Sequence, residues 1–198
     1  MPTDDEIYCN CMEELKHRIA VIDSVLIGST STTYPMFDSE LVYLLFRKSL
    51  ELIAFSSLTA NKVVYSAAYE NFANHWNAKR LLEYLEDVNA DFYPVAVNPP
   101  QTLANGTKSF SLVTEGFLTK DEFVCLYDQC GEILHARNPF ATSRRPAKFS
   151  FSPKEWVARI QNLIRYHVMH LINGDKLVAV IPNEGKVYLI RATSLVNV

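Results

Sequence analysis

Apolar side chains recur every three or four residues along the first part of the chain, and this spacing constrains the possible folds more than any other feature. The repeat runs through Ile7, Cys11, Leu15, Ile19, Ile22 and Leu26. Residues at this spacing lie on one face of an α-helix. Acidic side chains at Asp4 and Asp5 suit the positive end of the helix dipole. The sequence therefore predicts a helix from about Asp4 to Leu26, with one face in the core.

The middle of the chain predicts two more helices. Residues 41–58 are apolar on nearly all sides, as in a central core helix, and we expect this helix to begin near Asp38 or Ser39. Residues 63–88 predict another long helix, with Asn61 as the break between the two.

Two later helices are predicted from their N-terminal capping boxes. Thr119-Lys-Asp-Glu122 and Ser152-Pro-Lys-Glu155 each combine a hydroxyl and a carboxylate three residues apart. The two side chains satisfy each other's exposed backbone N–H groups. We expect the second of these helices to continue to Asn173-Gly174, a good C-terminal stop.

Strand signals occur in two places. Residues 91–117 hold three prolines and the pair Asn105-Gly106, which indicate a long irregular loop with a small hairpin. β-rich runs on either side of Pro-Asn-Glu-Gly predict an antiparallel hairpin over residues 176–192. We therefore expect a mainly α fold: a helical bundle over residues 1–174, with an irregular insertion at about 91–117, and a β-hairpin at 175–198 packed on the same domain.

Composition limits the possible functions. The chain has 198 residues, of which 48% are hydrophobic and 21% charged, which excludes a disordered chain and fits one domain. The net charge of −3 argues against strong whole-body attraction to nucleic acid or membrane, although a local basic patch could still bind either. The N-terminus lacks the regions of a signal peptide, and no apolar run reaches the roughly 20 residues that span a bilayer. We therefore expect a cytoplasmic protein without a membrane partner.

Common cofactor and metal motifs are absent from the sequence. It holds no glycine-rich dinucleotide or phosphate loop, no nucleophile elbow and no HExxH zinc motif. The four cysteines are Cys9, Cys11, Cys125 and Cys130. Their spacing fits a zinc site poorly, so we expect the cysteines to be small buried hydrophobic side chains.

His167 and His170 would share one face of a helix, but no third ligand completes a site, and a surface or cap role is favoured. We expect no metal and no small-molecule cofactor.

Two polar groups within the helical segments are candidates for a site. Arg47 and Glu51 lie four residues apart and can reach each other along one helix face. They form either a structural ion pair, which is favoured, or an incompletely paired part of a site. His75-Trp76-Asn77-Ala-Lys79-Arg80 is an aromatic and basic cluster, in which we expect Trp76 to pack against the core rather than stack on a nucleobase.

One stretch of this acidic chain is locally basic. It comprises His135, Arg137 and Asn138 at a predicted helix end, followed by Arg144, Arg145 and Lys148. Arginine forks suit phosphate oxygens, so an RNA-binding loop is one interpretation. The other is a solvated loop, with Arg137 capping the last carbonyls of the helix.

Two segments resemble the HEPN superfamily of small helical-bundle domains. They are Leu44-Leu-Phe-Arg-Lys-Ser-Leu-Glu-Leu-Ile and, much later, Leu134-His-Ala-Arg-Asn-Pro. The resemblance covers the helical parts of residues 5–170 and leaves out the C-terminal hairpin. It implies a helical bundle. Many members are metal-independent ribonucleases of toxin–antitoxin or antiviral systems, with an Arg-x4–6-His active site completed by dimerisation.

That catalytic motif is incomplete in this chain. Arg137-Asn138 matches its first half, but residues 142–144 are Thr-Ser-Arg where the histidine is expected, and only His135 is nearby. Proton transfer needs a histidine directed at the scissile phosphate. We therefore expect a non-catalytic HEPN-like binding or regulatory subunit of a larger complex, with a protein partner or a second copy, and with RNA as a candidate ligand. The alternative is a ribonuclease in which His135, Arg137 and Glu51 converge in one open cleft.

Overall fold

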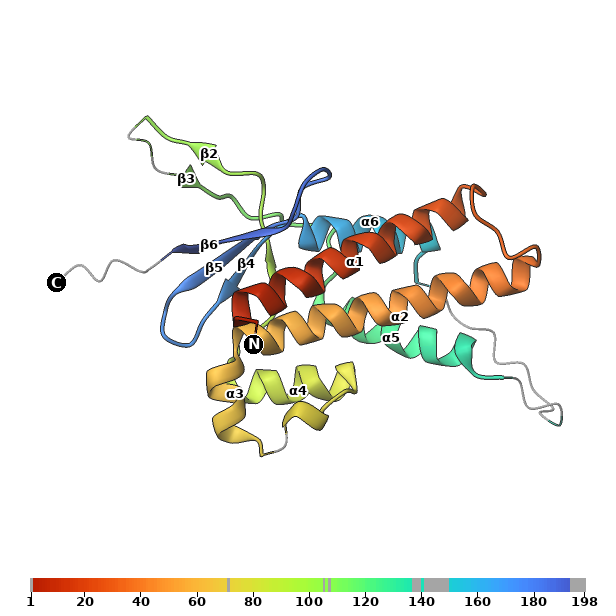
Figure 1. The fold of residues 1–198 in the computed structure, drawn as a ribbon, viewed down its shortest axis with the longest axis horizontal. Coiled ribbons are helices and arrows are strands. Elements are labelled where there is room, and N and C mark those ends of the chain that lie inside the picture. The colour runs from red at the N-terminus through yellow and green to blue at the C-terminus, as the bar shows by residue number, and fades with distance from the viewer. Residues whose placement is uncertain are drawn as a thin grey trace.

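Two long antiparallel helices run through the centre of the molecule (Figure 1). The computed structural model describes residues 2–70, 72–104, 106, 108–136, 140 and 150–192. α1 spans Asp4–Leu26, the range that the sequence predicts, and begins at a capping box between Thr3 and Glu6. α2 spans Pro35–Ala60. The tight pairing of α1 and α2 follows from their facing apolar sides.

α2 begins earlier than the sequence predicts, at Pro35 rather than near Asp38 or Ser39. Proline at the first helical position has a backbone already suited to a helix. The Asp38 carboxylate accepts hydrogen bonds from the Thr32 N–H (2.6 Å) and the Ser31 hydroxyl (2.8 Å). This side chain therefore fastens the preceding loop to the first turn of α2 instead of capping the helix.

The segment over residues 63–88, predicted as one helix, is divided in the structure. α3 spans Lys62–Ala68, the 3₁₀ turn η1 spans Phe72–Asn74, and α4 spans Ala78–Val88. The Asn77 side chain caps α4 by accepting from the Arg80 N–H at 3.1 Å. Asparagine favours such caps over helix interiors, which explains the interruption. The predicted break at Asn61, between α2 and α3, is confirmed.

The last two helices begin at their predicted capping boxes. α5 spans Lys120–Leu134 and lies beside α2, while α6 spans Pro153–Ile164 and packs against α1 (Figure 1). The prediction that α6 continues to Asn173-Gly174 is wrong, because strand β4 occupies Tyr166–His170. β4 hydrogen-bonds to a strand on each side, and this tertiary pairing outweighs the local helical pattern.

A four-stranded antiparallel sheet lies at one end of the helices (Figure 1). Its order is β1-β4-β5-β6, with β1 at Val95–Ala96, β5 at Lys176–Val180 and β6 at Tyr188–Ala192. The β5–β6 pair is the C-terminal hairpin that the sequence predicts. The smaller central hairpin is also present, with β2 at Gln101–Thr102 and β3 at Lys108–Ser109.

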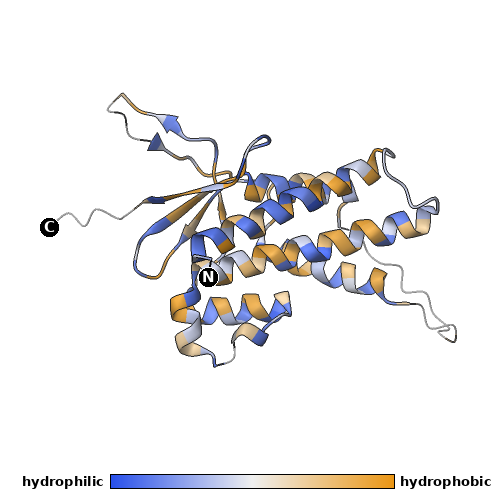
Figure 2. Cartoon of the chain, in the orientation of Figure 1, coloured by the Kyte–Doolittle hydropathy of each residue, from blue (hydrophilic) through white to orange (hydrophobic). Residues whose placement is uncertain are grey.

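One hydrophobic cluster joins the helices to the inner face of the sheet. It includes Tyr8 from α1, Phe46 from α2, Trp156 from α6, and Leu177 and Ala179 from β5. α2 carries hydrophobic residues along most of its length, as suits its central place (Figure 2). The hairpin therefore packs on the helical body, and the described chain is mainly α. None of its described helices has the length and apolar character needed to cross a membrane.

Candidate functional site

Arg47 and Glu51, the first candidate pair, form part of the contact between α2 and α5. The Arg47 guanidinium donates to the Tyr127 hydroxyl at 2.8 Å and lies 4.3 Å from the centroid of that ring. Its Nε lies 3.4 Å from one oxygen of Glu51, while the other oxygen accepts from Lys48 at 2.9 Å. Both charges are therefore satisfied between packed helices, which favours the structural interpretation of the pair.

The residues expected for a ribonuclease are only partly described. His135 follows the last residue of α5, and its side chain is exposed without a hydrogen bond or ion pair to any described residue. Glu51 is held by Arg47 and Lys48, and no hydrogen bond or ion pair joins it to His135. The expected RNA-binding residues Arg137, Asn138, Arg144, Arg145 and Lys148 lie outside the described residues.

The two histidines of β4 do not form the pair that a helix would have made. On a strand, residues three apart point to opposite faces. His167 is buried against α1, whereas His170 is partly exposed. The expectation of a shared surface face is therefore wrong. Burial lowers the pKa of His167 to about 4, so its imidazole is neutral at physiological pH.

The cysteines behave as hydrophobic side chains in the described region. Cys130 is buried, and Cys9, Cys11 and Cys125 are partly buried. Burial raises the pKa of Cys11 to about 11 and that of Cys130 to about 12, so both are protonated at neutral pH. Among the described residues no three His, Cys, Asp or Glu side chains gather closely enough to hold a metal ion.

Trp76 differs most from expectation. The sequence predicts that it packs against the core, but its side chain is 68% exposed. The reason is the interruption between α3 and α4, which places Trp76 in a loop just before the cap of α4. A helix through this point could have turned the indole toward the core, whereas the loop directs it outward.

Behind Trp76 lies a packed aromatic cluster. The His75 ring is 5.2 Å from the Tyr84 ring and 6.1 Å from the Tyr69 ring, between centroids. Its Nδ1 lies 2.8 Å from the Tyr65 hydroxyl. Tyr69 in turn lies 4.9 Å from Tyr84, and its hydroxyl donates to Asp87. These contacts hold the loop that carries Trp76 against α3 and α4.

A surface hollow of about 320 Å³ forms between Trp76 and α4. It is lined by Asn74, His75, Trp76, Asn77, Arg80, Leu81 and Tyr84, and we call it the Trp76 hollow. The exposed Arg80 guanidinium has no hydrogen bond or ion pair with any described residue. An exposed indole can stack on a flat aromatic ring, and a free guanidinium can bind an anion beside it. The hollow therefore suits a ligand that combines both groups.

The sequence indicated this segment but not its role. The cluster from His75 to Arg80 stands out in the sequence, whereas the packing of Tyr69 and Tyr84 against His75 does not. The i,i+4 spacings of Tyr65 with Tyr69, and of Arg80 with Tyr84, could have shown that aromatic and basic side chains share helix faces.

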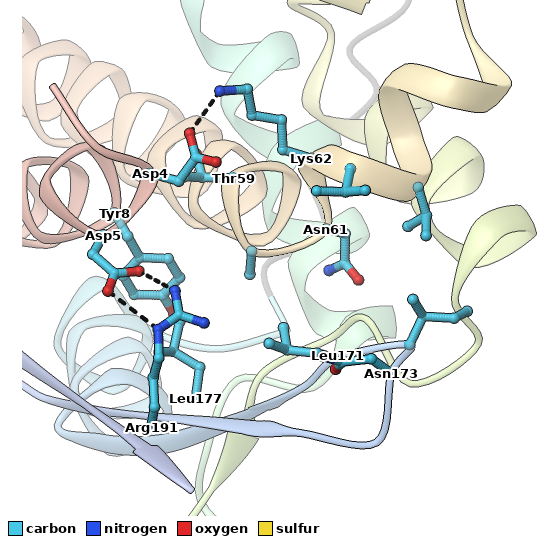
Figure 3. Close-up of a pocket in the computed structure, with 14 residues that line it drawn as sticks. Asp4, Asp5, Tyr8, Thr59, Asn61, Lys62, Leu171, Asn173, Leu177 and Arg191 are labelled. Carbon is cyan, nitrogen blue, oxygen red and sulfur yellow. Dashed lines mark hydrogen bonds and ion pairs between the residues drawn. The ribbon is translucent and has the colours of Figure 1, made fainter. Parts of the chain in front are cut away.

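A second cavity, of about 270 Å³, opens between the start of α1, the α2–α3 junction and the β4–β5 turn (Figure 3). At its mouth Asp4 lies 2.6 Å from Lys62, and Asp5 accepts from both Nε and Nη2 of Arg191 (Figure 3). The ring of Tyr8 lines the interior. The four charged groups at the mouth therefore form two ion pairs with each other.

Comparison with known proteins found no matching family model, no matching curated protein and no matching solved structure. The HEPN resemblance therefore depends on the residues of this chain alone.

Proposed function

We propose that this chain is a non-catalytic, HEPN-like binding subunit that recognises single-stranded RNA at the Trp76 hollow. The observation that carries the proposal is an indole exposed by 68% beside the Arg80 guanidinium, which has no hydrogen bond or ion pair to a described residue. Tryptophan joins a large apolar ring to one polar N–H and is enriched at binding surfaces.

The chemistry of a single strand matches the hollow. An unpaired nucleobase presents a flat π face that stacks on an indole, and each such contact is worth roughly 1–3 kcal/mol. The adjacent phosphate carries the charge that Arg80 binds. A duplex keeps its bases stacked on one another, so it offers no free face to Trp76. The hollow therefore favours single strands over duplexes.

The remaining polar residues support a binding role over catalysis. Glu51 is engaged by Arg47 and Lys48, and His135 lacks a described partner that would orient its imidazole. A general base must be held so that its acceptor atom lies within hydrogen-bond reach of the proton that it removes from the substrate. The family resemblance extends the proposal to a place in a larger complex, of the toxin–antitoxin or antiviral kind.

The test measures binding of short fluorescent oligonucleotides by anisotropy. We expect Trp76→Ala to weaken binding of single-stranded RNA by about tenfold or more, from the lost stacking energy, and Trp76→Phe to weaken it less. Arg80→Ala should weaken binding and lower the slope of log K against log salt by about 0.7, the value for one phosphate contact on a single strand. Arg80→Lys should retain most of that slope.

The matched control is Tyr34→Ala, which removes an equally exposed aromatic side chain at the start of α2. It should bind RNA like the wild type. If wild-type protein shows no preference for single strands, or if Trp76→Ala and Tyr34→Ala behave alike, the proposal is wrong. Cleavage of RNA that resists chelator and disappears in His135→Ala would establish the ribonuclease instead.

A further inference from the structure

Strand β6 forms one edge of the sheet, and its outer backbone groups can be identified. Ile181, just after β5, donates its backbone N–H to the carbonyl of Arg165, just before β4. This bond shows which residues of β5 direct their backbone groups toward β4 and which toward β6. In an antiparallel ladder successive residues point alternately toward each neighbouring strand. With Val178 opposite Ile190, the N–H and C=O groups of Leu189 and Arg191 therefore point away from β5.

Only part of this edge is protected within the described chain. The outward N–H of Val187 donates to the Glu13 carboxylate at 2.6 Å, which closes the edge at that residue. The backbone amides of Leu189 and Arg191 donate to no described residue. Charged side chains often guard an open edge. Here the Arg191 side chain is bound by Asp5 and does not cover the edge.

Space for an added strand exists beside β6. A groove of about 740 Å³ runs between β6 and the first turns of α1, lined by Pro2, Asp5, Glu6, Cys9, Asn10, Val187, Tyr188 and Leu189. On its helical wall, Asp5 already binds Arg191 of the same chain and Glu6 accepts from Thr3 in the capping box of α1, while the strand wall is largely apolar. The occupant that fits is an extended strand with apolar residues.

We propose that a second copy of this chain occupies the groove by antiparallel pairing of β6 with β6. With Ile190 on the two-fold axis, Leu189 of each copy lies opposite Arg191 of the other. Both residues point outward, so each such pair exchanges two backbone hydrogen bonds. The two sheets then become one continuous sheet through the dimer.

The side chains are self-complementary in this register. Leu189 and Arg191 share the face of the sheet that meets α1, so the aliphatic part of Arg191 from the second copy lies against Leu189, while its guanidinium stays bound to Asp5 of its own copy. On the other face, Ile190 meets its symmetry mate and enlarges the small apolar cluster of Val168 and Val178. A peptide from another protein would need side chains that match Leu189 and Arg191 on one face and Ile190 on the other, whereas a second copy of β6 already has them.

The test uses the full chain without RNA, by sedimentation velocity over a range of protein concentrations. We expect a monomer–dimer equilibrium in the wild type. Arg191→Pro removes one outward N–H at a position where an edge strand tolerates proline, and should abolish the dimer. Arg191→Ala, the matched control, loses the same charge but keeps the amide, and should retain a measurable dimer. Trp76→Ala should dimerise like the wild type, which separates this inference from RNA binding.

Amide hydrogen exchange of the wild type tests the same strand pairing without a variant, so the result does not depend on whether Arg191→Pro folds. The amides of Leu189 and Arg191 should exchange at least tenfold more slowly at concentrations where the dimer is populated, while Gly185 in the β5–β6 turn should not change. A chain that stays monomeric at every concentration, or a dimer in which the two amides are not protected, would overturn the proposal. Equal loss of the dimer in Arg191→Ala and Arg191→Pro would also overturn strand pairing.

Discussion

The hydroxyl of Tyr8 lies 2.5 Å from Nε2 of His167, a buried hydrogen bond that joins α1 to β4 across the core. The other ring nitrogen of His167, Nδ1, lies 2.8 Å from the Ile164 carbonyl and therefore donates to it. Nε2 must then be the unprotonated nitrogen, which accepts from Tyr8. The imidazole is neutral, in agreement with a pKa that burial lowers.

This arrangement predicts a loss of stability in mild acid. Burial lowers the pKa of His167 from 6.5 to about 4 in the folded chain. Between these pH values the unfolded chain binds a proton that the folded chain does not, so the free energy of unfolding falls as the pH drops from about 6.5 to about 4. The expected loss is about 3 kcal/mol, from 1.36 kcal/mol for each pKa unit. Urea denaturation at a series of pH values measures it.

The control for this prediction is His167→Gln, which cannot titrate. Carboxylates such as Glu6 and Glu155, whose pKa values are lowered by their capping hydrogen bonds, destabilise both proteins at lower pH. The difference between wild type and variant therefore isolates the histidine, and a difference that does not change with pH would contradict the assignment.

Arg47 is expected to contribute to stability and not to RNA binding. Arg47→Ala removes the bond to Tyr127 and leaves Glu51 with only Lys48, so we expect a loss of about 2 kcal/mol in the free energy of unfolding. Arg47→Lys should recover part of it. Lys79→Ala breaks an exposed ion pair to Asp128 and should cost less than about 1 kcal/mol. Reduced RNA affinity in a fully folded Arg47→Ala protein would instead place this residue in a binding site.

Asn89 connects the α2–α3 junction to the sheet. Its side-chain amide donates to the Asn61 side chain at 2.7 Å and to the His170 carbonyl at 2.9 Å. Asn89→Ala removes the donor from both of these mostly buried acceptors. We expect the free energy of unfolding, measured by urea denaturation, to fall by about 2 kcal/mol. The exposed Asn183→Ala, at a side chain without a hydrogen bond to a described residue, serves as the comparison and should stay within about 0.5 kcal/mol of the wild type. Similar losses in the two variants would show that the buried network is not the cause.

Ser152 caps α6 through a reciprocal pair of hydrogen bonds with Glu155. Ser152→Ala should lower the free energy of unfolding by about 1 kcal/mol, because the N–H of Glu155 loses its acceptor. Ser152→Asp keeps a side-chain acceptor and should restore most of the loss. Thermal unfolding of the three proteins decides the matter, and an unchanged midpoint in Ser152→Ala would argue against the cap.

Elements with local signals were predictable, and those without them were not. The helices at Asp4, Lys120 and Pro153 begin at capping boxes, in which both partners lie within four residues of each other. The strand at Tyr166–His170 lacks such a signal, since its pairing partners lie far away in the sequence. Of the candidate sites, the His75 to Arg80 cluster was visible as a pattern, but its exposure was not.

The sequence by itself determined where most helices start, that the chain is mainly α, and that a hairpin follows at residues 176–192, because capping, apolar periodicity and turn formation act between near neighbours in the chain. The tertiary structure alone decided that His167 is buried under Tyr8, that Trp76 points outward beside Arg80, and that the amides of Leu189 and Arg191 lie at an open edge. Each of these features depends on which segments, distant in the sequence, pack against a residue. Packing of the whole chain determines those contacts, and local conformational preference does not.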